Sequence, residues 1–245
     1  MKHLIQALAL AIFGALLSGC AAANTDRTYS FLEPVRDAPA ASTPMPTGLQ
    51  RQSTPAGFIS FCMRFADQCA APRAPQGDVI LTAASWNTMG LVDDRTNSAI
   101  APEDDREHYG RAEYWDIPMD GRGNCKDYAL TKRKLLTDAG FPSQALRIAI
   151  VLTGAGERHV VLTVTTNRGD YVLDNLTGEI RPWSDTGYAW IERQSGANPR
   201  SWVGFQGYAD DWRQQASLLP QNPRVPPTKK RLNPTVHRHR RVLGS

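Results

Sequence analysis

The stretch from Gly121 to Gly140, GRGNCKDYALTKRKLLTDAG, constrains the fold most, because a glycine-rich loop leads directly into an amphipathic helix pattern. Apolar or small residues recur there close to the 3.6-residue period of a helix; they are Cys125, Tyr128, Ala129, Leu135, Leu136 and Ala139. Gly140 suits a left-handed C-terminal cap. Lys132 also falls on the apolar stripe, where we expect its ammonium group to reach water, and Leu130 falls outside it. We predict a central helix with the Cys125 thiol directed towards the body of the domain.

Cys125 would be the first residue of this helix, a position that can make its thiol more reactive. The unpaired N–H groups of a helix's first turn carry partial positive charge and favour a thiolate. A buried, inert cysteine is the alternative. The chain has four cysteines, of which Cys20 lies in the N-terminal segment and Cys62 and Cys69 lie close together. Cys125 is left unpaired, and in an oxidising compartment this favours a functional role.

The spacing of Cys62 and Cys69 sets a condition on a disulfide between them. On one unbroken helix their Cα atoms would be roughly 10 Å apart, beyond the limit of about 7 Å for a disulfide. A bridge therefore requires the helix to break near Asp67 and Gln68. We predict both the disulfide and the break.

The first 20 residues, MKHLIQALALAIFGALLSGC, have the pattern of a secretory signal, in which Lys2 precedes an apolar run and small residues follow. The run is short for a membrane span. Its ending, Leu-Ser-Gly-Cys, resembles a bacterial lipobox, in which the cysteine becomes the lipidated N-terminus; ordinary cleavage near residues 21–23 is the alternative. We expect a periplasmic protein anchored to the outer membrane by a lipid on Cys20.

Composition divides the remaining chain into three parts. Residues 21–55 are rich in Pro, Ala, Ser and Thr without an apolar period, which predicts a flexible tether. Residues 56–219 are long enough for one domain with a substantial core. Residues 220–245 hold seven Lys and Arg and no acid, so the net charge of +4 for the whole chain becomes −3 without them. We expect this basic tail to be disordered.

Helical patterns come first within the domain, and strand patterns follow the central helix. Phe58, Phe61, Cys62 and Phe65 form a short stripe, and after a Thr82 cap Trp86, Met89, Val92, Thr96 and Ile100 recur at helical spacing. The polar stretch Ala101–Asn124 predicts a loop that forms a cleft wall, or a surface loop held down by its aromatic residues. Strands are predicted at 145–152, 159–166, 170–174, 188–191 and 202–205. This order predicts an α+β fold, with N-terminal helices packed on an antiparallel sheet.

The second and third predicted strands are joined closely enough to form a hairpin. With a two-residue turn at Asn167 and Arg168, Val161 faces Asp174, and His159 is the diagonal neighbour of Asp174 on the same face. A turn shifted by one residue keeps the face but moves Asp174 away from His159. A three-residue bulged turn would leave the register undefined. The first register lets a carboxylate reach an imidazole.

These residues suggest a nucleophile with its base. His159 would take the proton of Cys125 and later protonate a leaving amine, and Asp174 would hold the ring and stabilise its charge. The backbone N–H of Cys125 would provide half of an oxyanion hole. The alternatives are a polar surface histidine and an aspartate that opens a turn. His108 is the other histidine within the domain, and it lies in an acidic loop.

The segments GRGNCKDYALTKRKLL, HVVLTV, YVLDNLTGEIRPW and GYAWIERQ resemble the bacterial transglutaminase-like cysteine peptidases. The similarity runs from about residue 59 to 203 and includes Trp86, Asn97 and His108-Tyr109-Gly110. It implies a papain/transglutaminase-like fold with the catalytic cysteine at the start of the central helix. It also implies Cys125 as nucleophile, His159 as base and Asp174 as third member of a triad. The best-understood branch is similar to periplasmic proteases that release large biofilm adhesins and need calcium.

One departure from that family affects the metal. The family pattern Asp-Cys-Glu-Asp-Tyr places an acid on each side of the cysteine, and in the calcium-dependent branch these acids bind the ion. Here the pattern is Asn124-Cys125-Lys126-Asp127-Tyr128. Asn124 still offers a carbonyl oxygen, but Lys126 does not bind calcium, which prefers several oxygen ligands. We therefore predict no cofactor. Calcium is the alternative, and Lys126 argues against it.

The predicted function is that of an exported cysteine endopeptidase acting on a protein substrate. An amide acyltransferase would form the same acyl-enzyme and differ in the acceptor. A catalytically degenerate family member that acts as a periplasmic binding protein is the non-enzymatic alternative, with Asn124 and Lys126 marking a lost site. The basic tail would bind an acidic protein or an anionic surface, and nucleic acid is not an expected partner of an exported chain.

Overall fold

The computed structural model describes residues 37–46 and 50–205 of the 245-residue chain. Its helices are α1 (Ala56–Arg64), α2 (Ala83–Ala99), α3 (Asp105–Tyr109) and α4 (Cys125–Asp138), with short 3-10 turns at Asp67–Cys69, Ser143–Ala145 and Trp183–Asp185. The predicted signal segment 1–20, tether residues 21–36, the end of the domain from 206 and the basic tail lie outside the described residues. Within the described residues, no helix is long and apolar enough to cross a membrane.

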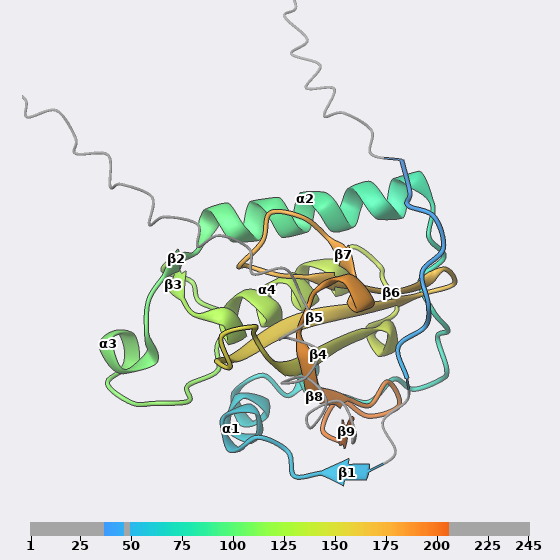
Figure 1. The fold of residues 1–245 in the computed structure, drawn as a ribbon. Coiled ribbons are helices and arrows are strands. Elements are labelled where there is room, and N and C mark those ends of the chain that lie inside the picture. Colours follow the sequence, from blue (N-terminus) through green and yellow to red (C-terminus); the bar gives the residue numbers. More distant parts are fainter. Residues whose placement is uncertain (1–36, 47–49, 206–245) are drawn as a thin grey trace, which may run out of the picture. The chain divides into compact units, whose positions relative to one another are not determined.

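The main sheet is antiparallel and has the strand order β1-β9-β8-β4-β5-β6-β7 (Figure 1). Its strands are β1 (Gln50–Gln52), β4 (Leu146–Leu152), β5 (Arg158–Thr166), β6 (Gly169–Leu173), β7 (Arg181–Pro182), β8 (Ala189–Gln194) and β9 (Trp202–Gly204). A separate parallel pair joins β2 (Ala101–Pro102) to β3 (Arg122–Gly123). The predicted α+β class with N-terminal helices and an antiparallel sheet is confirmed.

The β5–β6 hairpin has the register that the two-residue turn predicts. Thr166 pairs with Gly169 across the turn at Asn167 and Arg168, and Leu162 pairs with Leu173. This register places Val161 opposite Asp174, because each step along one strand is matched by a step back along the other. Gly169 has φ +108°, and a Cβ there would lie 2.7 Å from the carbonyl oxygen of Ser42. The turn therefore requires glycine both for its backbone conformation and for the segment that crosses it.

The sheet has an apolar layer on each face. On one face α4 packs against β4 and β5, and α2 packs on α4. This layer includes Phe58, Met89, Leu130, Leu136, Ile148, Leu162 and Trp202. The other face is covered by Met45, Val151, Val161, Val172, Trp183, Trp190 and Phe205. Successive strand residues point to opposite faces, so the near-continuous apolar runs of β4 and β5 reflect burial on both sides.

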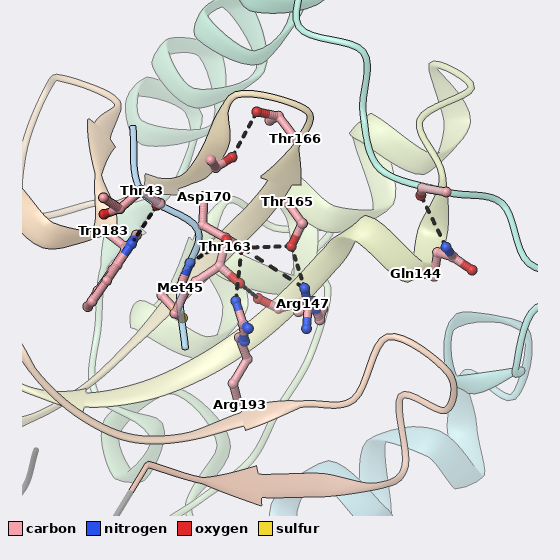
Figure 2. Close-up of polar contacts among 12 residues, drawn as sticks. Thr43, Met45, Gln144, Arg147, Thr163, Thr165, Thr166, Asp170, Trp183 and Arg193 are labelled. Carbon is pink, nitrogen blue, oxygen red and sulfur yellow. Dashed lines mark hydrogen bonds and ion pairs between the residues drawn. The ribbon is translucent and has the colours of Figure 1, made fainter. Parts of the chain in front are cut away.

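Residues 37–46 are packed against the sheet, so the prediction of a flexible tether through residue 55 is wrong for this part of the segment. Trp183 Nε1 donates to the carbonyl oxygen of Thr43 at 2.9 Å, and the Met45 N–H donates to Asp170 Oδ2 at 2.8 Å (Figure 2). Met45 itself is buried, and β1 extends the sheet by pairing with β9. The low apolar content of the segment did not predict this packing, because one buried methionine and backbone hydrogen bonds are enough to hold the segment.

Helix α4 has the predicted bounds, but its surroundings differ from the amphipathic pattern. Lys132 does not reach water: its Nζ lies 2.7 Å from Asp93 Oδ1 of α2, and both side chains are 1% exposed. Leu130 is buried, whereas Leu135 is 41% exposed. The reason is that α4 lies between α2 and the sheet and is covered on two sides, so a single apolar stripe does not describe it.

Helix α1 ends at Arg64, and Phe65 leaves the helical conformation before the 3-10 turn Asp67–Cys69. This break brings the Cα atoms of Cys62 and Cys69 to 5.5 Å, and their sulfur atoms form a disulfide.

The polar stretch before α4 contains α3, β2 and β3 and is anchored by Trp115, which is buried edge-on against Phe58 at 5.6 Å between ring centres. The aromatic residues therefore do hold this loop to the core.

Candidate active site

Cys125 is the first residue of α4 and carries a free, half-buried thiol. The helix start is fixed by a capping box in which the Asn124 side chain accepts from the helix backbone and Asp127 Oδ2 accepts from the Asn124 N–H at 2.9 Å. A Cβ on Gly123 would lie 2.6 Å from that carboxylate oxygen. The glycine before the cap is thus required by the close approach of Asp127, which sets the backbone that presents the thiol.

His159 and Asp174 form a buried hydrogen-bonded pair. His159 Nε2 lies 2.7 Å from Asp174 Oδ1, and each residue is 4% exposed. His159 lies near the start of β5 and Asp174 directly follows β6, so the hairpin register brings them to the same end of the sheet. The diagonal contact expected from the two-residue turn is present.

The electrostatics of His159 join this pair to Cys125. Burial lowers the pKa of His159, but the hydrogen bond to Asp174 and the electrostatic interactions with Asp174 and Cys125 outweigh it and raise that pKa to about 9. Because Asp174 occupies Nε2, Nδ1 is the ring nitrogen that remains available to the sulfur. The structure thus brings together the three residues that the sequence nominated.

Asp174 has further partners that keep it ionised. Burial raises its pKa, but hydrogen bonds from His159, from the Tyr188 hydroxyl and from the Leu176 N–H outweigh this and lower it. The Asn97 side-chain amide of α2 donates to the Asp174 carbonyl oxygen at 2.9 Å. Both the carboxylate and the backbone of Asp174 are therefore fixed by neighbouring elements.

Tyr188 is a site residue that sequence reasoning did not identify. Its hydroxyl donates to Asp174 Oδ2, and its ring meets the His159 ring edge-on at 5.8 Å. Burial and the charge of Asp174 raise the pKa of the Tyr188 phenol, so it remains a proton donor to the carboxylate. The sequence predicted a strand at 188–191 but carried no signal that placed this hydroxyl beside Asp174.

The residue after Cys125 belongs to a separate ion pair. Lys126 Nζ lies 2.9 Å from Asp105 Oδ2, and both side chains are largely buried. His108, the competing histidine, pairs instead with Asp120 at 2.7 Å. Across residues 37–46 and 50–205 there is no group of three or more His, Cys, Asp or Glu side chains that could hold a metal ion. Asn124 and Lys126 thus do not assemble a carboxylate cluster around the cysteine.

Comparison with known proteins gives one family. The model of the family described as bacterial transglutaminase-like cysteine proteinase BTLCP matches residues 49–210. Among solved structures, Legionella pneumophila LapG is 21% identical with a TM-score of 0.42, over 65% of this chain and 87% of that one. The EGTA-treated form of the same protein is 19% identical with a TM-score of 0.43, over 65% of this chain and 88% of that one. The calcium-bound form is 20% identical with a TM-score of 0.39, over 64% of this chain and 98% of that one. The search of curated proteins gave no match.

Proposed function

We propose that this chain, which belongs to the bacterial transglutaminase-like cysteine proteinase family and is a cysteine peptidase, hydrolyses internal peptide bonds of a protein substrate through Cys125, His159 and Asp174. The family match covers all three residues. The observation that carries the proposal is the buried imidazole of His159, which is hydrogen-bonded to Asp174 and interacts electrostatically with Cys125. A nucleophile, a base and a group that orients the base are the parts that covalent acyl transfer requires.

In the first half of the reaction the Cys125 sulfur attacks the substrate carbonyl carbon. The thiol proton moves to His159 Nδ1, and Asp174, bonded to Nε2, stabilises the imidazolium that results. The Cys125 N–H, in the first turn of α4, donates to the developing oxyanion. The carbon–nitrogen bond then breaks, the amine leaves with the proton from His159, and a thioester remains on Cys125.

In the second half water replaces the departed amine. His159 takes a proton from the water as its oxygen attacks the thioester carbonyl carbon. The carbon–sulfur bond breaks, the carboxylic acid product leaves, and the proton on His159 returns to the sulfur. An amine in place of water would give acyl transfer between side chains, so the acceptor alone separates hydrolysis from the acyltransferase alternative.

The proposed site of action is the periplasm, with a lipid on Cys20 holding the protein at the outer membrane. The Cys62–Cys69 disulfide supports export, because structural disulfides form and persist in oxidising compartments. The basic tail, residues 220–245, is proposed to contact an acidic protein or an anionic surface near the substrate. These assignments are separate from the chemistry at Cys125 and are tested separately, by membrane fractionation of a Cys20→Ala strain.

The chemistry is tested by the rate at which iodoacetamide labels Cys125 at neutral pH. We expect His159→Ala to slow labelling by about tenfold or more, because the thiolate loses the imidazolium that stabilises it. His108→Ala is the matched control, since it removes a histidine that is also bonded to an aspartate, and it should leave the rate unchanged.

The same variants are then compared in cleavage of an unfolded protein. Cys125→Ser and His159→Ala should both abolish it. Equal labelling in the wild type and His159→Ala would contradict the proposed triad, and rapid labelling without any cleavage would favour the binding-protein alternative.

A further inference from the structure

The junction of α3 and the start of α4 is built around a buried carboxylate. Asp105, the first residue of α3, is 3% exposed. Its Oδ2 accepts from the Tyr114 N–H at 2.8 Å and lies 2.9 Å from Lys126 Nζ, and its Oδ1 accepts from the Asn124 side-chain amide. Both oxygens are therefore engaged by donors of the chain itself.

The second carboxylate at this junction is also occupied. Asp127 is fully buried; its Oδ1 accepts from the Asp116 N–H and its Oδ2 from the Asn124 N–H, both at 2.9 Å. The two aspartates lie close enough to Lys126 and to each other for their charges to interact. Lys126 therefore supplies the positive charge of a junction that otherwise carries two buried acids.

A calcium ion does not fit these residues. Calcium takes six to eight oxygen ligands, several of them carboxylates. Here the two residues that flank Cys125 are Asn124, which turns its amide nitrogen towards Asp105, and Lys126, whose ammonium already contacts that carboxylate. A divalent ion would have to displace a buried ion pair and would meet donors where it needs acceptors.

We infer that the Lys126 ammonium is a built-in cation that takes the place of a divalent ion at this junction. It neutralises Asp105 and holds α3 against the helix start that carries Cys125. The stability of this part of the fold, and with it the geometry of the thiol, is then independent of calcium. This inference concerns the junction alone and is tested by unfolding, so its failure is distinguishable from failure of the proposed peptidase activity.

The first test is thermal unfolding of the full chain in excess EGTA and in millimolar calcium chloride. We expect the two Tm values to agree within about 1 °C, because a ligand that does not bind the folded state does not shift its unfolding. A Tm that rises by several degrees in calcium would overturn the inference. Calorimetric titration of the EGTA-treated chain with calcium tests the same point directly, and we expect no heat of binding.

The second test removes the charge. Lys126→Met keeps most of the unbranched side chain, one atom shorter, but leaves Asp105 buried without a cation, and we expect Tm to fall by roughly 10 °C. The matched control is Lys134→Met on the same helix, where an exposed lysine pairs with Asp138, and its Tm should change by no more than about 2 °C. An unchanged Tm in Lys126→Met would overturn the role of the ammonium.

The third test converts the cation into a ligand. Lys126→Glu places a third carboxylate beside Asp105 and Asp127, and we expect its lowered Tm to rise in millimolar calcium. Lys126→Met should show no such rise, because it adds no oxygen. A Lys126→Glu chain that ignores calcium would overturn the claim that Lys126 is what stands in the place of the ion.

Discussion

The β5–β6 hairpin carries a buried aspartate at each end, and the two differ in their partners. Asp170, at the turn end, accepts from Arg193 Nη1 at 3.0 Å, Thr165 Oγ1 at 2.7 Å and the Met45 N–H at 2.8 Å (Figure 2). Asp174, at the open end, accepts from His159 and Tyr188. Both aspartates are almost fully buried, on the same face of β6 and four residues apart.

The difference lies in whether the partner can give up its proton. Burial lowers the pKa of Arg193 to about 10, which still leaves it charged at neutral pH, so the pair with Asp170 is a fixed structural contact. His159 can exchange a proton with a neighbouring sulfur, so the pair with Asp174 suits a reaction. Burial and ion pairing alone therefore do not identify a catalytic carboxylate.

The largest expected effect is the loss of activity in Asp174→Asn. The amide cannot stabilise the imidazolium, so we expect kcat/KM on an unfolded protein substrate to fall by about 10²–10⁴-fold. The free energy of unfolding should change much less than in Asp170→Asn, because the Tyr188 hydroxyl retains an acceptor. Steady-state proteolysis and urea unfolding of the same preparation measure the two quantities. A chain that lost stability but kept its rate would reverse the roles of the two aspartates.

Asp170→Asn should instead reduce stability and leave the reactivity of Cys125 unchanged. It leaves the Arg193 guanidinium buried without a counter-charge, which we expect to lower the free energy of unfolding by about 3–5 kcal/mol. The rate of Cys125 labelling in the folded fraction should stay at the wild-type value. Urea denaturation and iodoacetamide labelling test this, and a slowed label in fully folded protein would show that the turn end of the hairpin acts on the site.

The smallest expected effect is on how the free energy of unfolding depends on pH. The pKa of His159 in the folded protein, about 9, lies above its ordinary value of 6.5. Its protonation therefore stabilises the fold fully below about pH 6.5, and the contribution is lost as the pH rises through 9. In the wild-type chain, we expect the free energy of unfolding to fall by on the order of 2 kcal/mol between about pH 6 and 8.

Two further chains complete this comparison. Adding Asp174→Asn should flatten the decline, because it removes the partner that raises the histidine's pKa. Adding Asp170→Asn should lower the curve by the same amount at both pH values, since Arg193 stays charged throughout. A slope that survives Asp174→Asn would mean that another group titrates in this range.

The hairpin and the residues that share its faces were predictable because they depend on local patterns. Period-two alternation fixes which residues share a face, so His159 and Asp174 could be placed on one face from residues 159–174 alone. The sequence left the turn open, and the observed pairing selects the two-residue turn that brings them into contact. The start of α4 at Cys125 was predictable for the same reason, from the glycine-rich loop before it and the helical period after it.

Contacts between distant segments were not predictable in this way. The Lys132 ammonium was predicted to reach water because its partner, Asp93, lies in another helix, and nothing near Lys132 in the sequence indicates that α2 covers it. Residues 37–46 have the composition of a linker, yet their backbone groups bond to Arg168 and Asp170 of the hairpin. Tyr188 reaches Asp174 only because β7 and the turn after it fold back beside β6. Each of these depends on tertiary packing, which a single sequence does not reveal.

The short distance along the chain between Cys62 and Cys69 also protects the third thiol during oxidation. Among the cysteines of the described residues, the native pair is separated by 7 residues, whereas Cys125 is 63 residues from Cys62 (125 − 62) and 56 from Cys69 (125 − 69). Closing the smaller ring costs about 2 kcal/mol less chain entropy, which favours the correct pairing by roughly 20-fold. Once formed, the bridge is shielded by its burial. A mild reductant added to keep the nucleophile active should therefore reach Cys125 well before it opens the bridge.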